Sequence, residues 1–238
     1  MKTVSFATQK GGIGKTAFTM ITCSYNYYVL HKRIGVIDCD FPQHTFAKER
    51  EDEIKQIRTL PDKMEAFKKL NIKPYNVLTS NPASTLTDIK KFTESGEEFD
   101  YIFVDLPGTV NTPGVLKTVA SINHVFVPLV ADTKVIRSSL EFGQLIQEKL
   151  IAPGNFPIRS LHFYWNMVVK SEKTDLYEKT NEALDKLGLQ RLNTVVESTV
   201  KFRKPGFCST MFPMDFRYIK DTRMLPLIEE VNSVLEKN

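Results

Sequence analysis

The sequence predicts an α/β fold, in which a doubly wound, mainly parallel sheet carries helices on both faces. Apolar runs of strand length alternate with helical patterns along all 238 residues, as is typical of parallel sheets. A glycine-rich turn joins the first apolar run to the first helical pattern, and polar clusters follow several of the runs. No Pro/Gly/Ser-rich linker interrupts this alternation, so residues 1–238 are expected to form a single domain.

Each expected strand is a short apolar run. These runs are 4–7, 34–38, 75–79, 101–105, 124–130, 160–165 and 193–196. The expected helices lie at 17–32, 44–71, 86–93, 134–150 and 173–187, followed by a final helix that carries an apolar stripe at Leu225, Ile228, Val231 and Leu235. Lys32 and Arg33 are expected in the last turn of the first helix, because cations are favoured at the negative end of a helix dipole.

The turn after the first run is a phosphate-binding motif. It reads Lys10-Gly11-Gly12-Ile13-Gly14-Lys15-Thr16 and enters the first helix at Ala17. In such a loop, backbone N–H groups and a helix N-terminus surround a phosphate. Lys15 is expected to pair with the β- and γ-phosphates, and the Thr16 hydroxyl is expected to hold Mg²⁺.

Two departures from the standard motif mark this loop. Gln9 stands where the standard pattern has glycine, and a second lysine, Lys10, stands near the start of the loop. Lys10 has no obvious task toward the nucleotide of its own chain. We therefore expect it to serve the nucleotide of a neighbouring subunit.

Carboxylates follow two further apolar runs. Asp105 ends the run 101–105 and is expected to hold Mg²⁺ through one of its waters, although a turn cap is the alternative. Asp38 ends the run 34–38 and Asp40 follows it, at a spacing that places both on one face of an extended chain. One of the two is expected to position an attacking water. A plain turn containing Asp and Pro explains Asp38 equally well.

Charge is concentrated near the C-terminus. The chain has a formal net charge of +4, and the segment 201–223 alone accounts for that charge because its two acidic residues face six basic ones. The basic residues are Lys201, Arg203, Lys204, Arg217, Lys220 and Arg223. This patch indicates an anionic partner, and a basic solvated face is the alternative.

Other features restrict the function classes. No apolar stretch of membrane-spanning length and no secretory signal is present, so the chain is expected to be cytoplasmic. Three widely spaced cysteines indicate reduced thiols. The final helix carries Glu229, Glu230 and Glu236 beside its apolar stripe. Anionic lipid would repel this helix, so core packing is expected and membrane binding is not.

Taken together, these motifs resemble the ParA/MinD group of deviant-loop ATPases. The resemblance rests on the loop at 10–16, the Asp-x-Asp cluster with Gln43, and the turn 105–108. Segments 164–166, 198–205 and 213–215 are similar to the ParA branch. The second motif departs from the family pattern, because Phe41 is inserted between Asp40 and Pro42.

The resemblance implies roles for particular residues. It implies that residues 10–17 bind ATP, that Thr16, Asp38 and Asp105 support Mg²⁺, and that Asp40 orients the hydrolytic water. It also implies that Asn166 reads the adenine edge. Lys10 would cross a homodimer interface to its partner's triphosphate, since two buried triphosphates concentrate negative charge that a donated cation stabilises.

The function implied by the resemblance is a slow ATPase that partitions or positions a DNA element. ATP-bound dimers would bind DNA without sequence preference and associate with the nucleoid, and a ParB-like or cargo-adaptor protein would stimulate turnover. Two alternatives stay open. One is a positioning ATPase for a cell-division or other protein cargo. The other is an enzyme of the same fold that modifies a small molecule, for which the sequence shows no second substrate pocket.

Overall fold

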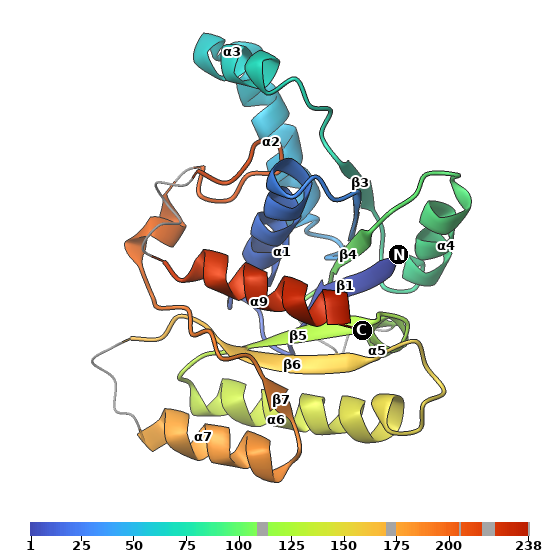
Figure 1. The fold of residues 1–238 in the computed structure, drawn as a ribbon, viewed down its shortest axis with the longest axis vertical. Helices are drawn as coiled ribbons and strands as arrows, with labels where there is room; N and C mark the ends of the chain where they lie inside the picture. Colours follow the sequence, from blue (N-terminus) through green and yellow to red (C-terminus); the bar gives the residue numbers. More distant parts are fainter. Residues whose placement is uncertain (109–113, 170–174, 205, 216–221, 238) are drawn as a thin grey trace.

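The computed structural model describes residues 1–108, 114–169, 175–204, 206–215 and 222–237. A seven-stranded sheet forms its centre, in the order β3-β2-β4-β1-β5-β6-β7, with every neighbouring pair parallel (Figure 1). The strands are β1 Lys2–Phe6, β2 Ile34–Asp38, β3 Asn76–Thr79, β4 Tyr101–Asp105, β5 His124–Leu129, β6 Ser160–Trp165 and β7 Gln190–Arg191. The first six match the predicted runs, and the predicted parallel α/β fold is confirmed.

Helices cover both faces of the sheet. They are α1 Lys15–Ser24, α2 Thr45–Thr59, α3 Pro61–Leu70, α4 Thr85–Glu94, α5 Val115–Ala120, α6 Thr133–Ile146, α7 Asp175–Lys186 and α9 Met224–Lys237. Neighbouring strand residues point to opposite faces, so Phe126 joins the core beneath α1 and α9, whereas Val125 and Val127 join the core beneath α4 to α7. The fold is therefore doubly wound, as predicted.

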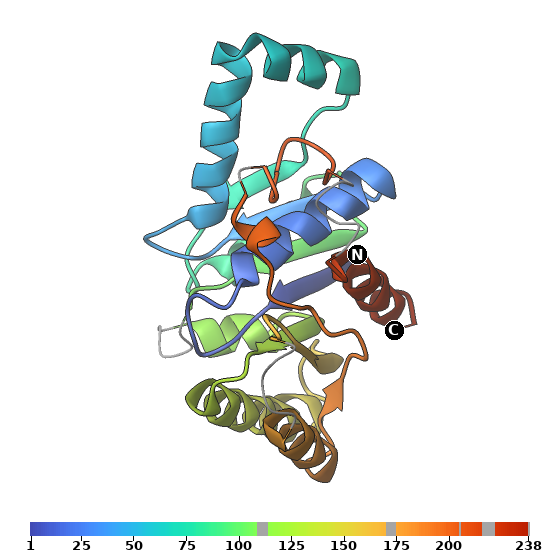
Figure 2. The same ribbon diagram turned by 90° about the vertical axis from the view of Figure 1, so that its left-hand side faces the viewer.

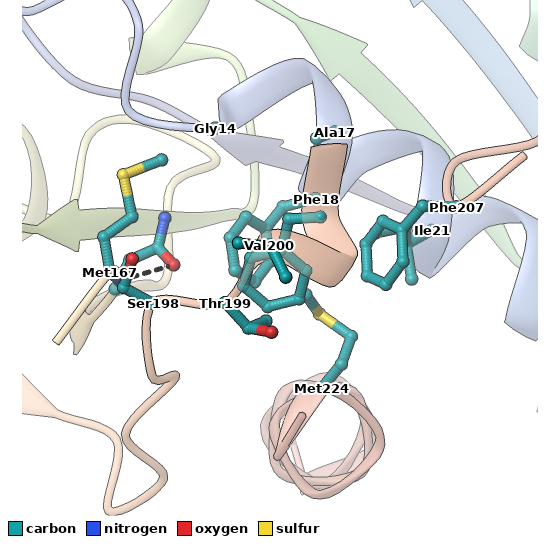
Figure 3. A pocket seen from close by; sticks show the side chains of 12 residues that line it. Gly14, Ala17, Phe18, Ile21, Met167, Ser198, Thr199, Val200, Phe207 and Met224 are labelled. Carbon is teal, nitrogen blue, oxygen red and sulfur yellow. Dashed lines mark hydrogen bonds between the residues drawn. The ribbon is translucent and has the colours of Figure 1, made fainter. Parts of the chain in front are cut away.

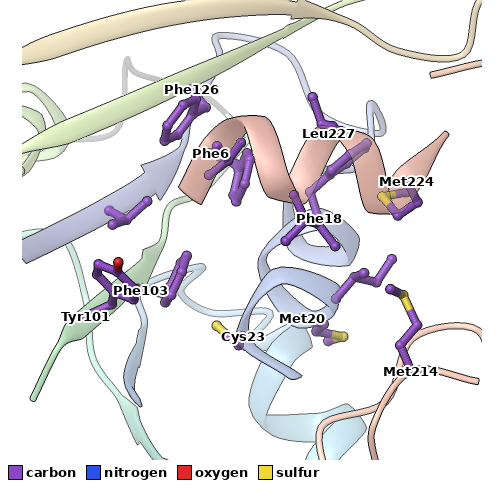
Figure 4. Close-up of a cluster of buried hydrophobic side chains, with 14 of the residues drawn as sticks. Phe6, Phe18, Met20, Cys23, Tyr101, Phe103, Phe126, Met214, Met224 and Leu227 are labelled. Carbon is purple, nitrogen blue, oxygen red and sulfur yellow. The ribbon is translucent and has the colours of Figure 1, made fainter. Parts of the chain in front are cut away.

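The final helix packs into the core, as its apolar stripe predicts. Figure 4 shows Met224 and Leu227 of α9 beside Phe18 of α1. Ile228 and Leu235 are also fully buried. No helix within the described residues is both long and apolar enough to span a membrane.

The first predicted helix ends earlier than expected. α1 passes into a π-helical stretch, Tyr25–Val29, and the left-handed backbone of His31 (φ 55°) follows. Lys32 and Arg33 therefore lie outside the helix, and their predicted place in its last turn is wrong. Arg33 instead pairs with Asp100 at 2.9 Å, across the loop that leads into β4.

The predicted helix 44–71 is two helices. The backbone turns extended at Leu60 (φ −108°, ψ 113°), between α2 and α3. Pro61 causes the break, because proline disfavours a helical conformation at the preceding residue and offers no N–H. Figures 1 and 2 show α3 standing away from the sheet at the far end of α2.

The predicted strand 193–196 is also wrong. The last strand, β7, lies at Gln190–Arg191 instead. The backbone N–H groups of Asn193 and Thr194 donate to the Glu230 carboxylate of α9, at 2.6 and 2.8 Å. A side chain far along the sequence thus captures the donors that a strand would use.

Candidate nucleotide-binding site

Three loops meet at the carboxyl ends of β1, β2 and β4. These strands are neighbours in the sheet, and Asp38 pairs in register with Asp105. The loop after β4 touches the loop after β1, since a Cβ added to Gly108 would lie 3.0 Å from the Gly11 Cα. The convergence expected from three separate polar clusters is thus present.

The loop 10–16 forms a concave cradle at the N-terminus of α1. Gly12 and Gly14 have φ angles of 76° and 88°, which strain any residue with a Cβ. α1 begins at Lys15, so its positive end opens onto the cradle. A cavity of about 440 Å³ lies there. Its lining comes from Gly11, Gly12, Gly14, Lys15, Thr16, Ala17, Asp40, Thr45, Gly108 and Met167.

Lys15 is the buried cation of this cradle. It is only 7% exposed, and its ammonium reaches back to the Lys10 carbonyl at 3.4 Å. Burial lowers the pKa of Lys15, while the carboxylates of Asp105 and Asp40 act in the opposite direction. A bound polyphosphate would favour the charged lysine in the same way as these carboxylates.

Asp105 is buried and has no hydrogen bond of ordinary geometry. Both of its carboxylate oxygens are orphaned within the described structure, and burial raises its pKa to about 7, with the Asp38 charge adding to the rise. The Thr16 hydroxyl and Lys15 lie near enough to favour the ionised form. An unpaired buried carboxylate is costly, and an oxygen donor beside a phosphate cradle suits Mg²⁺. The residues present therefore fit that ion.

Asp38 and Asp40 are held by the start of α2. Asp38 accepts from the backbone N–H groups of Asp40 (3.1 Å) and Ala47 (2.9 Å). Asp40 accepts from the Thr45 hydroxyl at 3.4 Å and lines the phosphate cavity. Burial raises the pKa of Asp40, as does the neighbouring Asp38. Asp40 is thus the aspartate that faces the cradle, whereas Asp38 is occupied by its own loop.

A second cavity adjoins the cradle and is largely apolar. It measures about 350 Å³ and shares Gly14, Ala17 and Met167 with the first. Figure 3 shows Phe18, Val200 and Met224 gathered around it. A polar cavity beside an apolar one of this size suits the two ends of a nucleotide.

Asn166 lies where the two cavities meet. Its amide nitrogen donates to the Ile13 carbonyl of the loop at 3.0 Å, and its amide oxygen accepts from the Met167 N–H at 2.9 Å. It is 1% exposed. The side chain therefore ties the end of β6 to the phosphate loop, in addition to lining the apolar cavity.

The remaining predicted residues lie outside the cavities. Lys10 is exposed. The pKa of Asp132 at the start of α6 is lowered mainly by the backbone N–H groups of Val135 and Lys134, and the charge of Lys10 adds a smaller contribution. Lys204 and Arg223 are exposed, and Lys201 is half-buried in the 3₁₀ turn Val200–Arg203. Arg217 and Lys220 lie outside the described residues, and the Arg203 side chain is not described.

Several cavity residues were not predicted. Phe18 and Ile21 follow Gly14 at helical spacing, so that face of α1 carried a readable signal. The sequence carries no comparable signal for Met167, because the position of its side chain depends on a left-handed backbone (φ 55°) after β6. Thr45 reaches the cradle only because the turn after Asp40 brings α2 back toward it.

The fold and this site define a P-loop ATPase of the ParA/MinD type. The family model of the ATPase MipZ matches residues 2–198, and the chain belongs to that family. Members of this group are ATPases that act in positioning. No curated protein gives a significant match.

Solved structures share the fold at low sequence identity. The MinC:MinD cell division complex of Aquifex aeolicus is 15% identical with a TM-score of 0.67, covering 100% of this chain and 97% of that one. A plasmid partition protein of Borrelia burgdorferi bound to AMPPNP is 16% identical (TM-score 0.65; 96% and 98%). The pNOB8 ParA bound to nonspecific DNA is 14% identical (TM-score 0.64; 100% and 99%).

Proposed function

We propose that this protein is an ATP-dependent dimerising ATPase that partitions or positions a DNA element. The observation that carries the proposal is the pairing of a Lys15 cradle with an orphaned Asp105 carboxylate and an adjoining apolar cavity. That arrangement suits the triphosphate, the metal ion and the base of ATP.

Within the site, each residue has a distinct task. Lys15 and the loop N–H groups bind the phosphates. Thr16 and Asp105 would hold Mg²⁺, with Asp38 in support, and the ion would supply charge neutralisation when bound. Asp38 fixes the loop that carries Asp40. Asp40 faces the phosphate cavity and orients the hydrolytic water. Asn166 holds the loop and borders the adenine pocket.

Dimerisation is proposed from the position of Lys10. Its side chain is exposed beside the cradle, while its own carbonyl accepts from Lys15. A second copy facing the cradle would place the partner's triphosphate within reach of this lysine. Hydrolysis would remove that target and loosen the dimer, so ATP would act as a timer.

DNA binding is proposed from the basic segment 201–223. Dimerisation would double its charge, and the pNOB8 ParA, which has the same fold, is described bound to nonspecific DNA. Each neutralised phosphate contributes about −0.9 to the salt slope, so binding should weaken steeply with added salt.

A protein cargo is the second candidate. Phe41, the residue inserted after Asp40, is 58% exposed beside the nucleotide site, and the Aquifex MinD structure is a complex with another protein, MinC. An exposed aromatic at this place suits contact with a protein more than with DNA.

Sedimentation tests the proposal. The protein is centrifuged with ATP, ADP or no nucleotide, each with and without duplex DNA. We expect a dimer in the presence of ATP and a monomer with ADP or without nucleotide. Only the ATP-bound dimer should co-sediment with DNA. Replacing Lys10 with Ala should abolish the dimer. Replacing both Lys201 and Lys204 with Glu should spare the dimer and weaken DNA binding, whereas the same change at Lys90 and Lys179 serves as the charge control. The proposal would be refuted if the particle mass were the same with ATP, with ADP and without nucleotide.

A further inference from the structure

The segment 207–214 lies between the two halves of the basic region and is bound closely by α2. In Figures 1 and 2 the chain after the 3₁₀ turn runs beside α2 and α1. Thr210, at its centre, is fully buried.

The main-chain and side-chain polar groups of Thr210 all bond to α2, and its carbonyl also accepts from the Tyr28 hydroxyl at 3.1 Å. Its N–H and hydroxyl donate to the Glu53 carboxylate at 2.7 and 2.6 Å. Its hydroxyl accepts from Arg50 Nε at 2.8 Å, and its carbonyl accepts from Arg50 Nη2 at 2.9 Å. Ser209 also donates to Glu53. Glu53 is itself only 6% exposed.

Such a contact is firm and specific. Charge-assisted hydrogen bonds to buried carboxylate and guanidinium groups are the strong ones. Arg50 is further fixed because it donates to the Tyr75 carbonyl at 2.9 Å and stacks 4.7 Å above the Tyr75 ring. A displacement of α2 must therefore move the Ser209–Thr210 backbone or break several of these bonds.

The other end of α2 is bonded to the nucleotide site. Asp38 accepts from the Ala47 N–H in the first turn, and Asp40 accepts from the Thr45 hydroxyl. Ala47 and Glu53 are six residues apart, which corresponds to about 9 Å of continuous helix. One rigid element thus joins the aspartates beside the phosphate cavity to the chain between the basic residues.

We propose that α2 couples the nucleotide site to the segment 207–214, with Arg50 and Glu53 as positioning residues. When a triphosphate and its cation enter the cradle, the charges around Asp38 and Asp40 change. Their hydrogen bonds to the first turn of α2 change with them. The helix carries that change to Ser209 and Thr210, and so to the orientation of the described basic residues Lys201, Lys204 and Arg223. The effect on DNA rests on the proposed function, whereas the coupling itself does not.

Hydrogen exchange of the full-length protein tests the coupling. Amide exchange across 207–214 is compared without nucleotide, with ADP and with a non-hydrolysable ATP analogue. In the wild type we expect the analogue to change the exchange rate of these amides by about fivefold or more. Thr210→Val, which deletes the shared hydroxyl, should reduce that response to less than about half while nucleotide affinity stays within about twofold.

Conservative variants separate coupling from simple stability. Thr210→Ser keeps the hydroxyl and should restore the wild-type response. Glu53→Gln should behave like Thr210→Val, because it removes the negative charge that strengthens the hydrogen bonds from Ser209 and Thr210. Glu51→Gln makes the same charge change on the exposed side of α2 and should have no effect.

Two results would overturn the proposal. The first is an unchanged amide exchange rate across 207–214 in the wild type when the ATP analogue is bound. The second is a Thr210→Val variant whose exchange rate responds to the analogue as strongly as that of the wild type. DNA affinity measured in parallel distinguishes the two proposals. If the exchange response is present but no nucleotide state binds DNA, the coupling stands and the proposed DNA function fails.

Discussion

Asp38 and Asp105 are register partners on adjacent strands, and both are fully buried, yet their surroundings differ. Asp38 accepts two backbone N–H groups and fixes the start of α2. Neither Asp105 oxygen has a hydrogen bond of ordinary geometry, and burial raises its pKa to about 7 although the nearby Thr16 hydroxyl acts to lower it. Two carboxylates that are register partners on adjacent strands can thus have different roles. One organises the loop, and the other is left for a cation.

The largest expected effect on nucleotide binding concerns Lys15, the cation that lies near the Asp105 carboxylate. Replacing Lys15 with Ala removes the only buried ammonium among the residues lining the phosphate cavity. Loss of charge-assisted bonds to phosphate should lower ATP affinity by about 100-fold or more. Titration with a fluorescent ATP analogue measures this. Replacing the exposed Lys90 of α4 with Ala is the control, since ATP affinity should then stay within about twofold. Unchanged affinity in the Lys15 variant would refute the assignment of the cradle.

The second effect is a pH dependence carried by Asp105. Its folded pKa of about 7 lies above the ordinary value, so its stabilising contribution is complete below about pH 4 and is lost as pH rises through 7. The loss is about 4 kcal/mol in the nucleotide-free protein. Asp105→Asn should remove it, so the variant should gain unfolding free energy relative to the wild type from pH 4 to 7. It should also lose Mg²⁺-dependent ATP turnover.

Urea unfolding without nucleotide or metal, repeated at several pH values, measures this difference. Asp52→Asn is a suitable control, because Asp52 is exposed on α2 and pairs only at the surface. Parallel stability curves for the wild type and the Asp105 variant would show that the carboxylate is not destabilised by its burial.

The smallest effect is expected at Asp38. Its replacement by Ala leaves the buried N–H groups of Asp40 and Ala47 without their acceptor. Unfolding free energy should fall by roughly 1–3 kcal/mol. Asp62→Ala, in the exposed first turn of α3, should change it by less than about 0.5 kcal/mol. If Asp38→Ala is as stable as the wild type, Asp38 does not organise the loop, and the contrast with Asp105 disappears.

Much of the fold could be predicted because the deciding signals are local. The apolar runs ending in Asp38 and Asp105 identified both strands, and the glycines between Lys10 and Thr16 identified the cradle. The break at Leu60 was also local, since Pro61 marks it.

The features that could not be predicted depend on distant contacts. Glu230 takes the backbone donors of Asn193 and Thr194 across 37 and 36 positions of sequence. Thr210 meets Glu53 across 157 positions. The residues around 193 and 210 contain no pattern from which Glu230 or Glu53 could be predicted as a partner. The spacing of Asn166 likewise gives no sign that its amide would bind the Ile13 carbonyl.

The outlying helix α3 has a consequence for how this protein tolerates substitution. It contributes no fully buried residue, and its main attachment is by Phe67 against Phe212 and by Leu70 at the core margin. Substitutions at the exposed positions of α3 should therefore cost little unfolding free energy. Phe67 is the exception, because it ties α3 to Phe212 in the segment 207–214.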